Sequence, residues 1–189
     1  RLDVHGSDLS GVNLSDAICI DANFQGGSLL HSNLYNADLT RANLNDVDLR
    51  HSDLRQTRST WAELRNIKLD STRMNGIDLS HAKLNNASMK GAIVKWGDIT
   101  GASLVGANLE RANLWGLTMH NANLSGANLT GANLVRAKLH GADLTEVTLD
   151  SAIVLEENWL SLLQEWNVGG FKHITETYEL VPAGSFFIL

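Results

Sequence analysis

Every fifth residue of this chain is hydrophobic, without a break in register, from Val4 to Val154. Of the 31 positions in this series, only Ser59 is polar. A strand alternates its faces every two residues and a helix every 3.6, so neither element produces a period of five. A short period sustained over about 150 residues indicates a repeat architecture, in which each unit buries its apolar side chain by stacking on its neighbours.

A second position of each five-residue unit is also restricted. The residue two places before each member of the series is usually small, as at Ala37, Ala107 and Ala127; the larger exceptions include Val12, Val47, Ile67, Ile77, Leu117 and Val147. The position between the two is often Asp or Asn, and the other two are mostly polar or Gly. Two inward positions in five can therefore line a narrow coil, with the small residue where space is least.

The charged residues indicate how many units close one coil. Within residues 1–154, ten charged pairs separated by 20 positions are opposite in sign and one is alike, an excess that separations of 15 and 25 do not show. Stacked residues avoid like charges, so residue n should lie beneath residue n+20, with four units per coil. One such column would contain Arg50, Asp70, Lys90 and Glu110.

These residues resemble the pentapeptide-repeat protein family. Its pattern of a small residue, Asp or Asn, Leu and two variable residues is found at residues 37–41, 127–131 and 142–146. The resemblance covers about 80 per cent of the chain. It implies an all-β solenoid, a right-handed quadrilateral β-helix of about eight four-sided coils. It also makes a cytoplasmic cyanobacterial protein the expectation.

The chain divides into two parts, a pentapeptide-repeat β-helix over residues 1–154 and a small C-terminal α+β cap over residues 155–189. Apolar residues at spacings of three and four predict a helix over about 156–167, presenting Trp159, Leu160, Leu163 and Trp166. Two short strands are predicted after Gly169-Gly170, over 172–181 and 184–189. The tail either closes the open end of the solenoid or pairs two copies as a homodimer through its helix.

Charge is unevenly distributed along the chain, whose net charge is −6. Residues 1–54 carry eight acids and three bases, whereas residues 55–95 carry three acids and eight bases. No hydrophobic run is long enough to span a membrane. The single cysteine, Cys19, occupies an inward position and is interpreted as a core residue. The chain begins with Arg1 inside the repeat, so a fragment or processed form is expected.

Stacking at 20 residues per coil brings two sets of candidate residues together. The first is a candidate interaction surface on one side, made of Tyr35, Arg55, Lys95, Trp96 and Trp115. Exposed aromatic residues near bases favour partner binding, but cover by the tail or simple exposure are the alternatives. The second is a column of Arg41, Trp61 and His81, beside Ser59, whose inward hydroxyl marks a polar defect or a binding notch.

No enzymatic constellation is expected from this sequence. It contains no phosphate-binding glycine loop, no HExxH and no evident Ser-His-Asp grouping. His31 stacks with His51, and His120 with His140, but neither pair has a third ligand in its column. We therefore expect no catalytic residue, no cofactor and no metal. The recurrent Asp and Asn residues are interpreted as turn and ladder hydrogen-bonding residues.

The sequence therefore predicts a non-catalytic scaffold that binds an unidentified protein partner. The alternative, implied by resemblance, is a DNA mimic that acts on DNA gyrase or another type II topoisomerase, by inhibition or by protection against quinolones. The basic middle of the chain departs from the continuous acidity of such mimics. Direct nucleic-acid binding is not expected either, because the bases alternate with acids and leave no continuous positive track.

Overall fold

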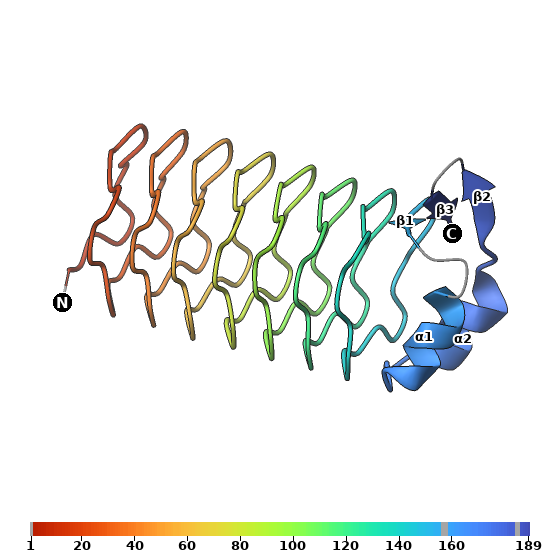
Figure 1. The fold of residues 1–189 in the computed structure, drawn as a ribbon. Helices are drawn as coiled ribbons and strands as arrows, with labels where there is room; N and C mark the ends of the chain where they lie inside the picture. Colours follow the sequence, from red (N-terminus) through yellow and green to blue (C-terminus); the bar gives the residue numbers. More distant parts are fainter. Residues whose placement is uncertain (1, 156–158, 184–185) are drawn as a thin grey trace.

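The computed structural model describes residues 2–155, 159–183 and 186–189. The chain winds into a four-sided solenoid with a small α+β tail at one end (Figure 1). Parallel bridges join residues 20 positions apart in successive coils, from Asp3↔Asn23 through to Asn133↔Ile153. The Val4 N–H donates to the carbonyl of Asn23 at 2.9 Å, for example. The prediction that residue n lies beneath residue n+20 is therefore confirmed.

Each side of the solenoid ends in a tight corner. The turn hydrogen bond runs from the fourth residue to the first, as from the Ser7 N–H to the Val4 carbonyl at 3.1 Å. The third residue of the corner has a positive φ throughout the solenoid, as in a type II turn. Gly, Asn and Asp tolerate this conformation, whereas a bulky residue there is an outlier.

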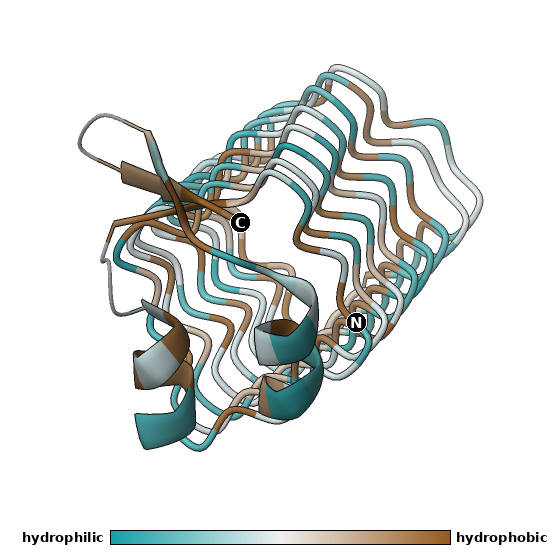
Figure 2. Ribbon diagram, turned by 90° about the vertical axis from the view of Figure 1, so that its right-hand side faces the viewer, coloured by the Kyte–Doolittle hydropathy of each residue, from teal (hydrophilic) through white to brown (hydrophobic). Residues whose placement is uncertain are grey.

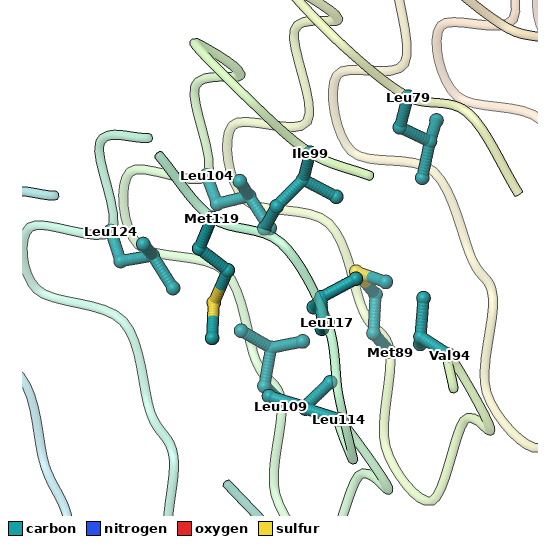
Figure 3. A pocket seen from close by; sticks show the side chains of 10 residues that line it. All are labelled: Leu79, Met89, Val94, Ile99, Leu104, Leu109, Leu114, Leu117, Met119 and Leu124. Carbon is teal, nitrogen blue, oxygen red and sulfur yellow. The ribbon is translucent and has the colours of Figure 1, made fainter. Parts of the chain in front are cut away.

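The large inward residues fill the axis of the solenoid. Leu129 is 1% exposed, Ser59 is buried in the same series, and burial raises the pKa of the Cys19 thiol. Figure 3 shows leucine, isoleucine, valine and methionine side chains around a void of about 10 Å³. A void this small and apolar holds no ligand, so the opening seen between the ribbons in the end-on view of Figure 2 is packed core.

Asp and Asn residues before the large inward residues make side-chain hydrogen bonds within the corners and between successive coils. Asp38 Oδ1 accepts the Thr40 N–H at 3.0 Å, within one corner. Asn33 Nδ2 donates to Asn13 Oδ1 at 3.1 Å, between coils. These are the turn and ladder hydrogen bonds that the repeated Asp and Asn residues were expected to make.

Charge pairing between coils is confirmed in part. One of the ten predicted pairs, Arg1–Asp21, lies outside the described residues because Arg1 does. Five of the other nine are ion pairs: Asp21–Arg41, Asp38–Arg58, Asp53–Arg73, Glu63–Lys83 and Lys90–Glu110. Arg50 does not pair with Asp70 as predicted; its guanidinium binds Asp48 of the same coil at 2.6 Å. A long side chain at a corner lies beside the outward residue of its own unit, so that carboxylate competes with the one on the next coil.

The tail contains two helices and a small sheet. The helices are α1 (Trp159–Glu165) and α2 (Phe171–Thr177), and the strands are β1 (Ile153–Val154), β2 (Val181–Ala183) and β3 (Phe186–Ile188). The sheet is antiparallel in the order β1-β3-β2. Each described helix has seven residues, too few to cross a bilayer.

The predicted tail is corrected at two points. Of the helix expected over 156–167, the structure describes α1, which ends at Glu165. Residues 156–158 lie outside the described part of the chain. The strand expected over 172–181 is wrong, because most of that segment forms α2. Phe171, Ile174 and Tyr178 are spaced three and four apart, so a helix turns them to one side, where they pack on the hydrophobic core.

The tail also returns to the solenoid and copies one of its corners. The Gly141 N–H donates to the Trp166 carbonyl at 2.8 Å, as it would to a further coil, and Asn167 has the corner's positive φ, at 52°. Gly169 then bridges Asp143 in parallel. Trp159 and Leu163 of α1 are buried at 4% and 0% exposure. Backbone groups at the end of the solenoid therefore have partners in the tail.

Candidate interaction surface

An aromatic and cationic cluster occupies one side of the solenoid. Lys95 and Trp96 are the two corner residues of one coil, and Trp115 is a corner residue of the next. The two indole rings meet edge to face, with centroids 4.3 Å apart and an interplanar angle of 71°. The Arg136 guanidinium lies 5.6 Å from the Trp115 ring centroid. We call these four residues the Trp96 cluster.

Trp96 is held in an unfavourable backbone conformation. Its φ is +57° and its side chain is 57% exposed. A left-handed conformation costs an L-residue about 1–2 kcal/mol. Its ring leans over Gly116 of the next coil, where an added Cβ would lie 2.5 Å from Trp96 Cε3. Other corners hold large residues at the same φ, such as Arg41 and His81, so the conformation alone does not distinguish Trp96. What distinguishes it is an exposed indole that contacts a second indole and has a glycine beneath it.

The five predicted surface residues form two groups. Arg55 lies 5.6 Å from the centroid of the Tyr35 ring, but its guanidinium also binds Asp53 at 2.7 Å. This hydrogen bond lowers the pKa of Asp53 and raises that of Arg55. One coil, with Asn75 at the equivalent corner, separates this pair from Lys95. The structure therefore keeps Lys95, Trp96 and Trp115 together and places Tyr35 and Arg55 apart from them.

The predicted column of Arg41, Trp61 and His81 is assembled in part. Trp61 and His81 stack with centroids 4.3 Å apart and planes at 13°. Arg41 makes a bidentate pair with Asp21, at 2.8 and 2.9 Å, and this pair raises the pKa of Arg41. Trp61 is 59% exposed at φ +60°, so it matches Trp96 in both respects without a neighbouring indole or cation–π partner among the described residues.

Both histidine pairs are adjacent. The ring centroids of His31 and His51 are 5.2 Å apart, and so are those of His120 and His140. Trp166 of the tail extends the second pair, 5.0 Å from His140. Within the described residues, His, Cys, Asp and Glu form no group of three or more that could hold a metal. These columns are therefore ring contacts between coils, stacked for His31 and His51 at 13° and edge to face for His120 and His140 at 68°.

Sequence reasoning missed three residues of this surface, Arg136, Asn113 and Asn133. The two asparagines, with Lys95 and Trp115, line an open hollow of about 240 Å³. All lie in three vertically adjacent units, 92–96, 112–116 and 132–136. Applying the 20-residue stacking to every neighbour of Trp115, rather than to aromatic residues alone, would have found them.

The fold and this surface define a class of protein, a repeat solenoid whose outward residues vary while its inward residues build a continuous core. The pentapeptide repeats family matches the chain in eight copies, over residues 17–56, 60–96, 98–116 and 118–150. The chain belongs to the pentapeptide repeat family, and its fold is the right-handed quadrilateral β-helix of that family. Members of this family are generally structural or interaction proteins.

Solved structures of the same family resemble this chain at low identity. One is HetL, a pentapeptide repeat protein from the cyanobacterium Nostoc sp. strain PCC 7120 that is involved in heterocyst differentiation regulation. It is 26% identical to this chain, the match covers 80% of this chain and 86% of HetL, and the TM-score is 0.32. A trypsin-treated form of QnrB1, a plasmid-mediated fluoroquinolone resistance protein, is 14% identical, with 89% and 98% covered and a TM-score of 0.41. A protein from the Arabidopsis thaliana thylakoid lumen is 20% identical, with 85% and 77% covered and a TM-score of 0.27. No curated protein matches significantly, and these likenesses are too low to transfer a role.

Proposed function

We propose that this protein is a non-catalytic scaffold that binds a protein partner through the Trp96 cluster. The observation that carries the proposal is the exposed Trp96 indole, kept at a strained corner and supported by Gly116. Trp and Arg are enriched at protein interfaces and among the residues that contribute most binding energy. The neighbouring Trp115 and Arg136 supply the same chemistry on the next two coils.

A matched pair of tryptophan variants tests this function. Trp96→Asn and Trp61→Asn remove equally exposed indoles from equivalent corners, and Asn tolerates a positive φ. Used as baits in an extract of the source organism, wild type and Trp61→Asn should retain a protein that Trp96→Asn loses. Equal retention by all three baits, or retention of nothing by any, would count against the proposal once thermal unfolding shows that all three are folded.

We infer that the tail closes the end of the solenoid. Its support is the burial of Trp159 and Leu163 and the hydrogen bonds that the last coil makes to Trp166 and Gly169. The alternative is a homodimer formed through α1 and the adjoining Trp166. Leu160 and Trp166 are only partly buried, but both already pack on the core of this chain. Light scattering over a range of protein concentrations separates these roles: a monomer at all concentrations supports closure, and a concentration-dependent dimer supports pairing.

Action on DNA gyrase as a DNA mimic is the second candidate. It is supported by residues 1–54, whose eight acids and three bases give a net charge of −5. The following coils weigh against it, because Arg55 and Arg65 bind carboxylates of their own coils and break the acidic surface. A supercoiling assay with a quinolone present decides the matter, since a mimic must change either supercoiling or drug poisoning.

A further inference from the structure

The hollow beside Trp115 has an unusual composition for an acidic protein. Its walls are Lys95, Asn113, Trp115 and Asn133, and it encloses about 240 Å³. The three stacked units around the hollow, 92–96, 112–116 and 132–136, contain no Asp or Glu, although the chain as a whole has a net charge of −6. Their only charges are Lys95 and Arg136.

The side-chain nitrogen atoms around the hollow can each donate further hydrogen bonds. Asn113 Oδ1 accepts the Trp115 N–H at 3.3 Å and Asn133 Oδ1 accepts the Val135 N–H at 3.0 Å. This fixes the carbonyl side of each amide and leaves its Nδ2 group to donate. Within the described part of the chain, neither Nδ2 has a hydrogen-bond partner and Lys95 Nζ has no carboxylate partner.

Most other cations of the basic region, residues 55–95, differ in this respect. Arg55 and Arg65 bind acids of their own coils, and Lys83 and Lys90 bind acids of adjacent coils. Lys68 makes no such ion pair, but its charge acts on the Asp48 carboxylate. Lys95 is therefore a cation whose charge is not neutralised locally, placed between two amide donors and an indole. An ammonium group with amide N–H donors around it binds a carboxylate well, and the adjacent rings bury the apolar stem that carries it.

We propose that this hollow binds a carboxylate side chain of an acidic segment in the partner protein, with the Trp96 cluster covering the apolar residues beside it. The inference rests on the proposed scaffold function and adds the partner's chemistry. Complementary charge steers association of this kind and selects among partners. A nucleic acid fits less well, because a phosphate backbone needs a continuous track of cations and the three units around the hollow offer two.

The test starts from a library of random 12-residue peptides displayed on phage and selected on the full chain. Peptides rich in Asp and Glu should be enriched on wild type, and should bind more weakly as salt is raised. One enriched peptide is then labelled for fluorescence anisotropy, alongside its analogue with Gln and Asn in place of the acids. The neutral analogue and single-stranded oligonucleotides should bind about tenfold more weakly or worse.

Two charge variants locate the binding site. Asn113→Asp keeps the Oδ1 acceptor that holds the corner and puts a like charge in the hollow, so the acidic peptide should lose about tenfold or more in affinity. Asn128→Asp is the matched control, because its Oδ1 accepts the Thr130 N–H at 3.0 Å on another side of the solenoid. Lys95→Glu should lose as much as Asn113→Asp, whereas Lys172→Glu in α2 should not.

Three results would overturn the inference: no enriched peptide, enriched peptides without excess acid, or equal weakening by Asn113→Asp and Asn128→Asp. Tighter binding of an oligonucleotide than of the acidic peptide would also reject it. None of these results alters the retention experiment with Trp96→Asn and Trp61→Asn. The partner's chemistry can therefore be wrong while the scaffold function stands, and the two failures are distinguishable.

Discussion

The close approach of two coils at Gly97 gives a sharp test of the packing. On successive coils, the small inward position is occupied by Ile77, Gly97 and Leu117. A Cβ added to Gly97 would lie 3.0 Å from the Ile77 carbonyl oxygen, 3.2 Å from Ile77 Cγ2 and 3.2 Å from Leu117 Cδ1. The carbonyl cannot retreat freely, because it accepts the Asp98 N–H at 2.9 Å. Gly97→Ala should therefore overpack the core.

The size of the effect follows from two opposing contributions. Overpacking a dense core costs about 1–3 kcal/mol. Replacing Gly by Ala reduces the entropy of the unfolded chain and returns about 0.4–1 kcal/mol. Gly97→Ala should thus lower the free energy of unfolding by about 1–2 kcal/mol. Urea unfolding measures this, followed by both circular dichroism and tryptophan fluorescence because a repeat protein can unfold in parts.

A double variant measures the contribution of Leu117 to this overpacking. Leu117→Ala alone should cost about 2–5 kcal/mol by leaving a cavity. Shortening Leu117 removes one of the three close contacts of the added methyl, so the double variant should be more stable than the sum of the singles by about 0.5–2 kcal/mol. Leu34→Ala, three coils away, should add independently to Gly97→Ala. A Gly97→Ala protein as stable as wild type, or additive behaviour with Leu117→Ala, would refute the reasoning.

Three further predictions concern the corners, the acid pairs and the tail. Gly116→Ala and Gly126→Ala both place a methyl at positive φ, and each should lower the free energy of unfolding by about 1–2 kcal/mol. Only the methyl of Gly116→Ala meets an indole, so this variant should lose more stability and change the tryptophan fluorescence. Equal losses of stability would contradict that contact. Arginine hydrogen bonds lower the pKa values of Asp48 and Asp53 below 3.8, the ordinary value for Asp. These carboxylates therefore stabilise the fold above that pH and stop doing so as the pH falls through their folded pKa values. The urea concentration at the midpoint of unfolding should decrease as the pH is lowered below about 4, and less steeply when Asp48→Asn and Asp53→Asn are combined. Identical slopes for the two proteins would argue against these pairs. Tyr178→Phe removes the hydroxyl that accepts a backbone N–H of the last coil at 2.9 Å. This loss should lower the free energy of unfolding by about 1 kcal/mol, measured by thermal or urea unfolding. No change would show that this contact is not formed in solution.

The solenoid could be predicted because its constraints are periodic. Leucine at every fifth residue fixes the inward direction, and opposite charges 20 residues apart fix the number of units per coil. Both signals are repeated many times, so a single exception such as Ser59 does not disturb them. Trp96 and Trp115 were placed together by the same arithmetic, because ring positions at adjacent corners follow directly from the backbone.

Side-chain choices and the tail could not be predicted in the same way. Arg50 can reach either Asp48 or Asp70, and the geometry of one corner decides between them. The tail has no repeat to fix its register, so a strand was predicted over 172–181, where most of the segment forms α2. The return of Trp166 and Asn167 to the solenoid depends on backbone hydrogen bonds that leave no mark in the sequence.

Four units per coil also determine how length changes would reshape this protein in evolution. Removing 20 residues deletes one complete circuit and leaves every downstream column aligned with those before it. Removing five preserves the leucine register but rotates everything after the deletion by a quarter of a circuit. Such a deletion between Trp96 and Trp115 would move the second indole to a neighbouring side while the core stayed filled. Surface patterns in this architecture can therefore be assembled or dispersed by deletions that leave the inward leucines in place.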